Sequence, residues 1–192
     1  SQGHHENTLA NALAYRFASR GEHFVFRAVN RLDRDTTGLL LIAKHKISGA
    51  FLSAMTAKKE IRREYLAIVA GKPEGSGTID LPIARKDGST IERCIDMDHG
   101  EHAVTHYRCL DYRDDLDCSL VLLRLETGRT HQIRVHMKAI GHPLLGDFLY
   151  NPDYRFIGRQ ALHSYTVAFR HPITGEAMEF TAPMPEDFSF FY

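Results

Sequence analysis

The chain has 192 residues, a length that fits one domain or one domain with a small appendage. Hydrophobic residues make up 43% and charged residues 25%, proportions typical of a folded globular protein rather than a disordered chain. Lys and Arg total 24 and so do Asp and Glu, which excludes a uniformly basic protein that coats nucleic acid but allows a local basic groove.

Along the chain, three segments show the helical spacing of apolar residues, and six short apolar or alternating runs indicate strands. The predicted helices are residues 8–20, 47–58 and 130–140. The predicted strands are residues 38–43, 65–70, 103–112, 119–125, 160–170 and 176–181. Most strands are joined by hairpin-like links, so we expect an α+β fold, with a mixed, mainly antiparallel sheet and flanking helices. No repeat or linker interrupts residues 1–192, which predicts a single domain.

Charge is distributed unevenly along this neutral chain. Basic residues dominate residues 27–63 and 124–142, and acidic residues dominate residues 96–117 between them. If the two basic stretches meet in space, they form a positive face of the kind that binds phosphate backbones. The alternative is solvated surface charge that cancels over the whole protein.

The first segment suited to chemistry is Asn30–Gly38 (NRLDRDTTG), which precedes a predicted strand. Asp, Thr and Gly are typical of a turn, and two carboxylates, Asp33 and Asp35, stand among arginines. An arginine next to Asp33 would keep its carboxylate ionised and oriented, and such a carboxylate can attack a sugar carbon. The alternative is a turn in which these side chains only satisfy backbone groups.

The second segment is residues 126–137 (ETGRTHQIRVHM), which leaves a strand through Gly128 and enters a helix. Arg129 in the loop and Arg134 in the helix favour a phosphate or carboxylate partner. The third is residues 62–67 (RREYLA). Its Tyr65, flanked by Arg62 and Arg63, is either a stacking platform for a nucleobase or a core aromatic whose hydroxyl is satisfied at the rim.

Histidines and cysteines do not indicate a metal site. Three histidines in or near the second segment lack the i, i+4 spacing that places two ligands on one helical face. They are His131, His136 and His142. The three cysteines form no CxxC pair, which argues against a zinc knot or a disulfide framework and favours a reducing, cytoplasmic setting. No apolar run is long enough to span a bilayer, so we expect no membrane partner.

Together these segments resemble one family, the RluA/RluD-type pseudouridine synthases. The resemblance is carried by NRLDRDTTGLLLIAK (residues 30–44), REYLAIVAG (63–71) and TGRTHQIRVHMKAIGHPLLGDFLY (127–150), in matching order and spacing, with Leu162-His163 resembling a final family segment. It implies a pseudouridine synthase catalytic domain. Such a domain isomerises uridine in RNA by breaking the N-glycosidic bond and rejoining the ribose to C5, without a cofactor or a metal.

The resemblance also implies residue roles. It assigns the catalytic aspartate to Asp33, the active-site tyrosine to Tyr65 and the arginine that pairs with the aspartate to Arg134. A further set is predicted to bind RNA: Arg31, which enters the RNA stack, with Arg34, Arg62, Arg63 and Arg129. Asn30 replaces the usual histidine. The family's opening strand is absent, so we expect a chain truncated at its N-terminus, with any accessory RNA-binding domain upstream.

Two other function classes compete with the synthase. A nucleosidase or glycosidase would use Asp33 and Asp35, although residues i and i+2 point apart on an extended chain. A non-catalytic RNA-binding module would need neither carboxylate. For the synthase we expect a flipped uridine in structured RNA, with ribosomal RNA as the first candidate and transfer RNA as the second. We expect the protein to act as a cytoplasmic monomer.

Overall fold

The computed structural model describes residues 6–192, which form two compact units. One unit comprises the chain up to residue 31 with residues 40–61 and 170–177. The other comprises residues 32–39, 62–169 and 178–192. No helix among the described residues is long and apolar enough to cross a membrane.

The first unit contains the helices α1 (Leu9–Ala18) and α2 (Lys46–Ala57), which confirm two of the predicted helices. α1 begins at a capping box: the Thr8 hydroxyl accepts a hydrogen bond from the Asn11 backbone N–H, and the Asn11 side chain accepts one from Thr8. Near the other end of α1, Phe17 stacks on Phe24 with 4.3 Å between ring centroids.

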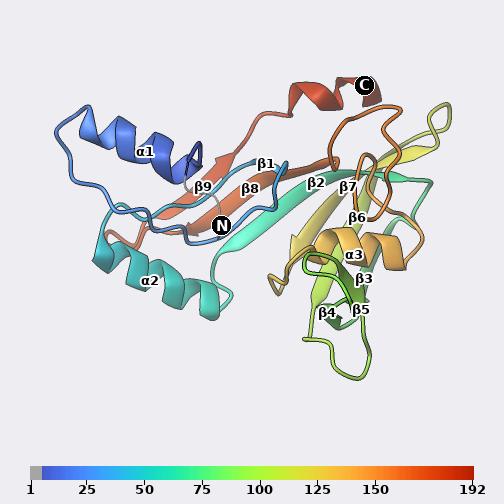
Figure 1. Cartoon of the computed structure of the whole chain (residues 1–192), viewed down its shortest axis with the longest axis horizontal. Helices are drawn as coiled ribbons and strands as arrows, with labels where there is room; N and C mark the ends of the chain where they lie inside the picture. The colour runs from blue at the N-terminus through green and yellow to red at the C-terminus, as the bar shows by residue number, and fades with distance from the viewer. Residues whose placement is uncertain (1–5) are drawn as a thin grey trace. The chain divides into compact units, whose positions relative to one another are not determined.

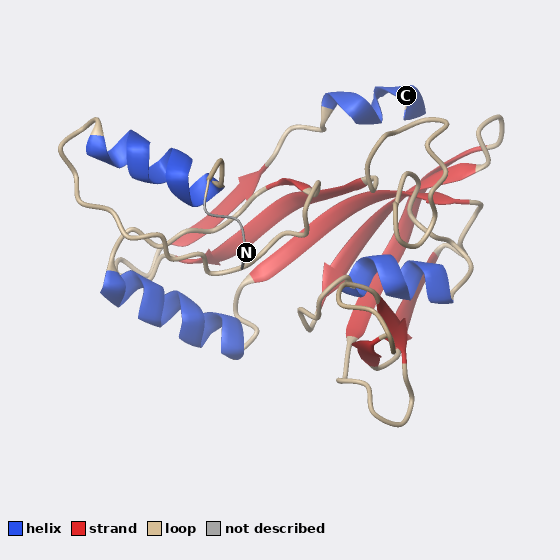
Figure 2. Cartoon of the chain, viewed as in Figure 1, coloured by secondary structure: helices blue, strands red, loops and turns tan. Residues whose placement is uncertain are grey.

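The second unit is built on a mainly antiparallel sheet with the strand order β1-β8-β2-β7-β6-β3, and β9 also pairs with β8 (Figures 1 and 2). β1 and β8 pair in parallel, and the pairs β2–β7, β2–β8, β3–β6 and β6–β7 are antiparallel. Its strands are β1 (Thr37–Gly38), β2 (Arg62–Ala70), β3 (Ser76–Asp80), β6 (Val104–Arg113), β7 (Cys118–Leu125), β8 (Leu162–Arg170) and β9 (Ala177–Thr181). A separate two-stranded hairpin consists of β4 (Ile83–Arg85) and β5 (Arg93–Ile95). The mixed, mainly antiparallel fold is therefore confirmed.

Both faces of this sheet are covered. Along β2, Tyr65 and Ala67 face one side, and Leu66 and Ile68 face the other, as the two-residue period of a strand requires. The helix α3 (Gln132–Ala139) packs on the first face (Figure 1). The short 3₁₀ helix η1 (Glu186–Phe191) inserts two phenylalanines into the core on the second. Burial on both sides explains the nearly continuous apolar run of β2.

One predicted strand was wrong, and several elements were missed. Residues 38–43 do not form a strand; only Thr37 and Gly38 pair with β8, and Ile42 makes a single bridge to Ala28. Gly38 has a φ of +101°, a left-handed conformation that does not continue a strand, so the pairing with β8 ends there despite the apolar sequence that follows. The short strands β3 to β5 and the helix η1 carried too little periodicity to be predicted.

Gly38 provides a direct test of how β1 docks on β8. A Cβ atom at this position would lie 2.2 Å from the Ser164 carbonyl oxygen, and the backbone conformation also disfavours any side chain. We expect Gly38→Ala to lower the free energy of unfolding by about 3 kcal/mol, from strain and overpacking together. Gly88→Ala is the matched control, because Gly88 has a similar positive φ but open space around it. Urea denaturation of both variants should therefore show Gly38→Ala as much the less stable; equal losses would contradict the tight docking.

Candidate active site

The site is centred on Asp33, in the loop that leads into β1. The Thr36 backbone N–H donates to the Asp33 carbonyl and closes a turn, and Asp35 adopts a left-handed φ of +68°. The Asp33 side chain is 16% exposed, so its carboxylate is neither fully buried nor freely solvated. A carboxylate in this position can meet a substrate while the protein controls its surroundings.

Two side chains from the segment just before β8, Arg159 and Gln160, bind this loop. Gln160 donates a hydrogen bond to the Arg34 carbonyl and another, of 3.2 Å, to the Thr36 hydroxyl. Arg159 donates to the Asp35 carbonyl at 3.1 Å. Arg159 is itself held by a bidentate ion pair with Asp187 at 2.6 and 2.8 Å. Because its backbone carbonyls are bound to the sheet, the loop presents Asp33 in a defined position.

Opposite the loop, α3 supplies Arg134, which is only 1% exposed. Its guanidinium makes a bidentate ion pair with Asp147, with Nε and Nη2 each 2.7 Å from a carboxylate oxygen. The third nitrogen, Nη1, lies 3.5 Å from Asp33 Oδ2. The structure thus brings Arg134 to Asp33 as predicted, but the closer partner is Asp147, which the sequence did not identify.

The charges of this triad favour an ionised arginine. Burial alone would lower the pKa of Arg134, but the hydrogen bonds and charge of Asp147, with the charge of Asp33, raise it overall. Asp147 is fully buried and also accepts backbone N–H groups of Leu149 and Tyr150. Since Asp147 already neutralises the guanidinium, the longer contact leaves Asp33 oxygens free to interact with a substrate.

Aromatic rings enclose the guanidinium. The Arg134 Cζ atom lies 5.0 Å from the Tyr150 ring centroid and 5.3 Å from that of Phe148. Arg34 lies over the Phe148 ring at 5.2 Å, so this ring has an arginine near it from the Asp33 loop as well. These contacts add cation–π attraction and exclude water from the ion pair.

His131 lies at the entrance to α3 in a left-handed conformation, with a φ of +57°. Its Nδ1 is 2.9 Å from the Tyr150 hydroxyl, which also accepts the Arg93 backbone N–H at 2.9 Å. Burial lowers the pKa of His131, although the nearby Asp33 charge opposes that shift.

Tyr65 lies on β2 opposite Ser164 of β8 and is only 5% exposed. Burial raises the pKa of its phenol, the Arg63 charge lowers it, and the Asp33 charge raises it again, with a net increase. The hydroxyl therefore stays protonated, and the Asp33 charge contributes to that increase in pKa. Because the ring belongs to the core cluster beneath α3, little of its face is open to a base, and its stacking role stays a prediction.

The five arginines predicted to bind RNA differ in their surroundings. Arg63 is half-buried near Gly128, and Arg34 is exposed and bonded to Asp35. Arg62 pairs with Glu179 at 2.7 Å, and Arg129 pairs with Glu101 and donates to the His102 carbonyl at 3.0 Å. Arg31 is exposed and belongs to the first unit. Among the described residues, no group of three or more His, Cys, Asp or Glu side chains is arranged to hold a metal ion.

Comparison with known proteins identifies the family of this chain. The family model described as RNA pseudouridylate synthase matches residues 1–139. The chain belongs to the RNA pseudouridylate synthase family. It is 45% identical over 190 residues to the uncharacterized RNA pseudouridine synthase YjbO of Bacillus subtilis, covering 98% of this chain and 66% of that protein. It is 42% identical over 204 residues to the ribosomal large subunit pseudouridine synthase D of Zymomonas mobilis, covering 99% and 64%.

Solved structures agree with this family assignment. The human RNA pseudouridylate synthase domain containing 1 superposes with a TM-score of 0.79 at 29% identity, over 93% of this chain and 74% of that one. The chain spans slightly less than two thirds of the length of the two bacterial pseudouridine synthases. The family likeness therefore covers nearly all of this chain but only part of those proteins.

Asp147 should be essential for the stability of this pseudouridine synthase domain. In Asp147→Asn the buried Arg134 would lose its bidentate counter-charge, and breaking such a pair costs about 3–5 kcal/mol. Asp153→Asn is the control, because Asp153 pairs with the exposed Arg155, and exposed pairs contribute about 1 kcal/mol or less. Urea denaturation at neutral pH measures both; similar losses would show that Asp147 is dispensable.

His136 should make the stability depend on pH. This buried residue of α3 bonds to the Thr105 hydroxyl and the Leu81 carbonyl, both at 2.9 Å, and burial lowers its pKa. Below about pH 6.5 the histidine takes up a proton more readily in the unfolded chain than in the folded one, which favours unfolding. The free energy of unfolding is therefore highest above that pH and decreases as the pH falls. We expect a lower urea midpoint at pH 5.5 than at 7.5, and a smaller difference in His136→Gln. The exposed His23 supplies the control variant His23→Gln, which should retain the wild-type difference.

Proposed function

We propose that this chain carries the catalytic domain of an RNA pseudouridine synthase that isomerises uridine to pseudouridine through Asp33. The observation that supports this most directly is the Asp33 carboxylate, partly exposed and 3.5 Å from an arginine whose charge Asp147 already balances. Because Asp147 makes the short contacts to Arg134, the Asp33 carboxylate can approach a sugar carbon without first breaking a short ion pair.

The reaction balances without any further reactant. The bond between C1′ and N1 of the uridine breaks, the uracil rotates, a bond forms between C1′ and C5, and the C5 proton is lost while N1 gains one. Asp33 either attacks C1′ or stabilises an oxocarbenium-like sugar. Because the raised pKa keeps the Tyr65 phenol protonated, Asp33 is better suited than Tyr65 to accept the C5 proton.

Access to C1′ requires the uridine to leave its stack. Unstacking costs a few kcal/mol, which inserted side chains offset. Arg31, Arg34 and Arg63 are the candidates we propose for contacts to the flipped nucleotide and its phosphates, and Arg62 and Arg129 for more distant phosphates. Hydrogen bonds from Arg159 and Gln160 hold the Asp33 loop in place against the bound nucleotide. An isomerase must keep water away from the sugar carbon, whereas a hydrolase must admit it.

A hydrolase is less well supported. Inversion or retention at a glycosidic carbon needs a second carboxylate placed to activate water or to protonate the leaving group. Asp35 is bonded to the exposed Arg34, and Asp147 is fully buried against Arg134. Neither is available for that role. A non-catalytic RNA-binding module would not require a buried arginine beside Asp33.

The partner we propose is structured RNA, with ribosomal RNA first because relatives such as the Zymomonas mobilis protein are named ribosomal large subunit pseudouridine synthase D, and transfer RNA second. We also propose that the protein acts as a monomer in the cytoplasm. Its cysteines Cys94, Cys109 and Cys118 are all free, which is consistent with a reducing compartment.

Substitution of the two loop aspartates tests the proposal. Asp33→Asn should reduce pseudouridine formation by about 10⁴-fold or more, because it removes the reacting group while keeping the side chain's shape. RNA affinity should stay within about threefold, since affinity comes mostly from phosphate contacts. Asp35→Asn is the matched control and should be nearly as active as wild type. Tritium release from RNA labelled at uridine C5 measures turnover, and nucleoside analysis detects any free uracil.

Three results would reject this assignment. Appreciable turnover by Asp33→Asn would remove Asp33 from the chemistry. An inactive Asp35→Asn with an active Asp33→Asn would show that the wrong carboxylate was chosen. Release of free uracil by the wild-type protein would identify a hydrolase instead.

A further inference from the structure

The β4–β5 hairpin places two arginines directly across from each other. In its antiparallel register Arg85 is the partner of Arg93, so two positive charges share one cross-strand position. Like charges in this arrangement destabilise a hairpin. None of the described residues supplies Arg85 with a carboxylate partner, and the one side-chain hydrogen bond of Arg93 goes to the carbonyl of its neighbour Glu92. Without a bound anion, the arginine pair therefore destabilises the folded protein.

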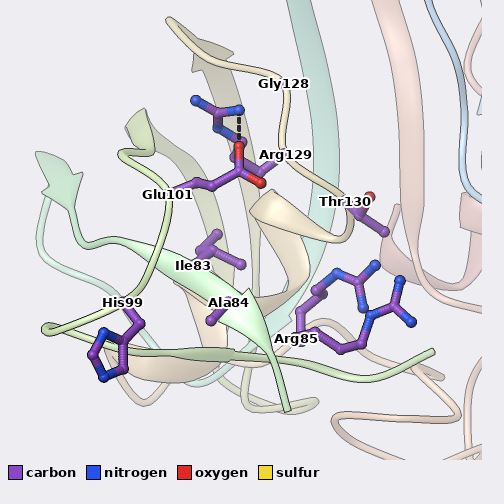
Figure 3. Close-up of a pocket in the computed structure, with 9 residues that line it drawn as sticks. Ile83, Ala84, Arg85, His99, Glu101, Gly128, Arg129 and Thr130 are labelled. Atoms are coloured by element: carbon purple, nitrogen blue, oxygen red, sulfur yellow. Dashed lines mark hydrogen bonds and ion pairs between the residues drawn. The ribbon is translucent and has the colours of Figure 1, made fainter. Parts of the chain in front are cut away.

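Three carboxylates on the hairpin and in the loop that follows it have partners of their own. Glu92 is bound by Lys86 at 2.9 and 3.0 Å, and Asp96 accepts the backbone N–H groups of Asp98 and His99. Glu101 is bound by Arg129, as the dashed line in Figure 3 shows. The two guanidinium groups thus remain available for an anion from outside the protein.

Both arginines line an open cavity of about 370 Å³, whose opposite wall is the loop that leads into α3 (Figure 3). Gly128, Arg129 and Thr130 form that wall. The cavity therefore combines three arginines with a segment that ends, within a few residues, at His131 and Arg134. This density of guanidinium groups suits phosphate, which arginine binds through its planar fork.

The hairpin is also tied physically to the candidate active site. Ile83 of β4 packs in one cluster with Val135 of α3 and with Tyr150. The Arg93 backbone N–H donates to the Tyr150 hydroxyl, which bonds to His131. An anion on the hairpin would therefore lie beside the site, where RNA flanking the reacting nucleotide must pass.

We propose that Arg85 and Arg93 bind the phosphate backbone of the RNA substrate next to the flipped uridine, an inference that rests on the proposed function. Arg129, held by Glu101, shapes the far wall of the cavity and adds positive potential there. The arginine pair contributes to affinity and to placement of the RNA, and takes no part in the bond changes at C1′ and C5.

The test compares Arg85→Gln/Arg93→Gln with wild type in the 192-residue chain, using a fluorescein-labelled uridine-containing RNA stem–loop. We expect affinity to fall by roughly tenfold and the slope of log affinity against log salt to decrease by about 1–2, because two phosphate contacts are lost. Turnover on large-subunit ribosomal RNA transcripts should show a raised KM and an unchanged kcat. Arg85→Lys/Arg93→Lys should recover most of the affinity, since the charges remain.

Arg108→Gln/Arg124→Gln is the matched control, because it removes the same charge from the opposite face of the sheet. Arg108 faces Leu122 in the register, and Leu122 packs with the core on the side away from α3. This control should bind the RNA as wild type does. Thermal unfolding provides an independent readout, because relief of the like-charge contact should leave the Arg85→Gln/Arg93→Gln protein as stable as wild type, or more so.

Several outcomes would overturn the proposal. They are wild-type affinity and salt slope in Arg85→Gln/Arg93→Gln, equal weakening in the control, a fall in kcat at saturating RNA, or a loss of thermal stability that accounts for the weaker binding. If the Arg85→Gln/Arg93→Gln protein binds RNA normally, the arginine pair binds a different anion, such as an acidic protein segment. If the wild-type chain binds the RNA but forms no pseudouridine in any transcript, the proposed function fails while the binding result still stands.

Discussion

The buried guanidinium of Arg134 is the interaction on which the site depends. A cation this deep in the protein is tolerated only when its charge and its hydrogen-bond donors are matched, because the cost of removing it from water is several kcal/mol. Asp147 matches it with a bidentate pair, and the aromatic rings of Tyr150 and Phe148 shield it. The helix α3, the Asp147 turn and the Asp33 loop are thereby required to meet at one point.

The unequal sharing of this arginine has a chemical consequence. Asp147 takes the two short contacts and is closed to solvent, whereas Asp33 has one contact of 3.5 Å and keeps an open side. One carboxylate is structural and the other is free to react, although both face the same cation. Environment, rather than residue type, separates their roles, as it does in other sites that use paired carboxylates.

Several separate backbone conformations and hydrogen bonds hold Asp33 in place. The left-handed residues Asp35 and His131 lie on the two segments that meet at the site, and backbone strain of this kind persists only where the surroundings enforce it. Arg159 and Gln160, just before β8, donate hydrogen bonds to backbone carbonyls of the Asp33 loop. The Tyr150 hydroxyl bonds to both His131 and the hairpin residue Arg93. Under the proposed function, an Asp33 carboxylate placed this way needs little reorganisation during the reaction. Of the two hairpin arginines, Arg85 is exposed and Arg93 is half-buried, and both line an open cavity, which suits a binding role that depends on counterion release.

The sequence by itself determined the elements whose signals are local. Apolar spacing and capping predicted α1, α2 and α3, alternation predicted the β6–β7 hairpin, and the family motifs singled out Asp33, Tyr65 and Arg134. Only the tertiary structure decided the rest. Residues 38–43 look like a strand, but the left-handed backbone at Gly38 ends the pairing with β8 after two residues. Asp147 stands 13 positions from Arg134 in a turn, where no periodicity marks it as the arginine's partner. The facing of Arg85 and Arg93 follows from the register of two three-residue strands, which are too short to show a period in the sequence.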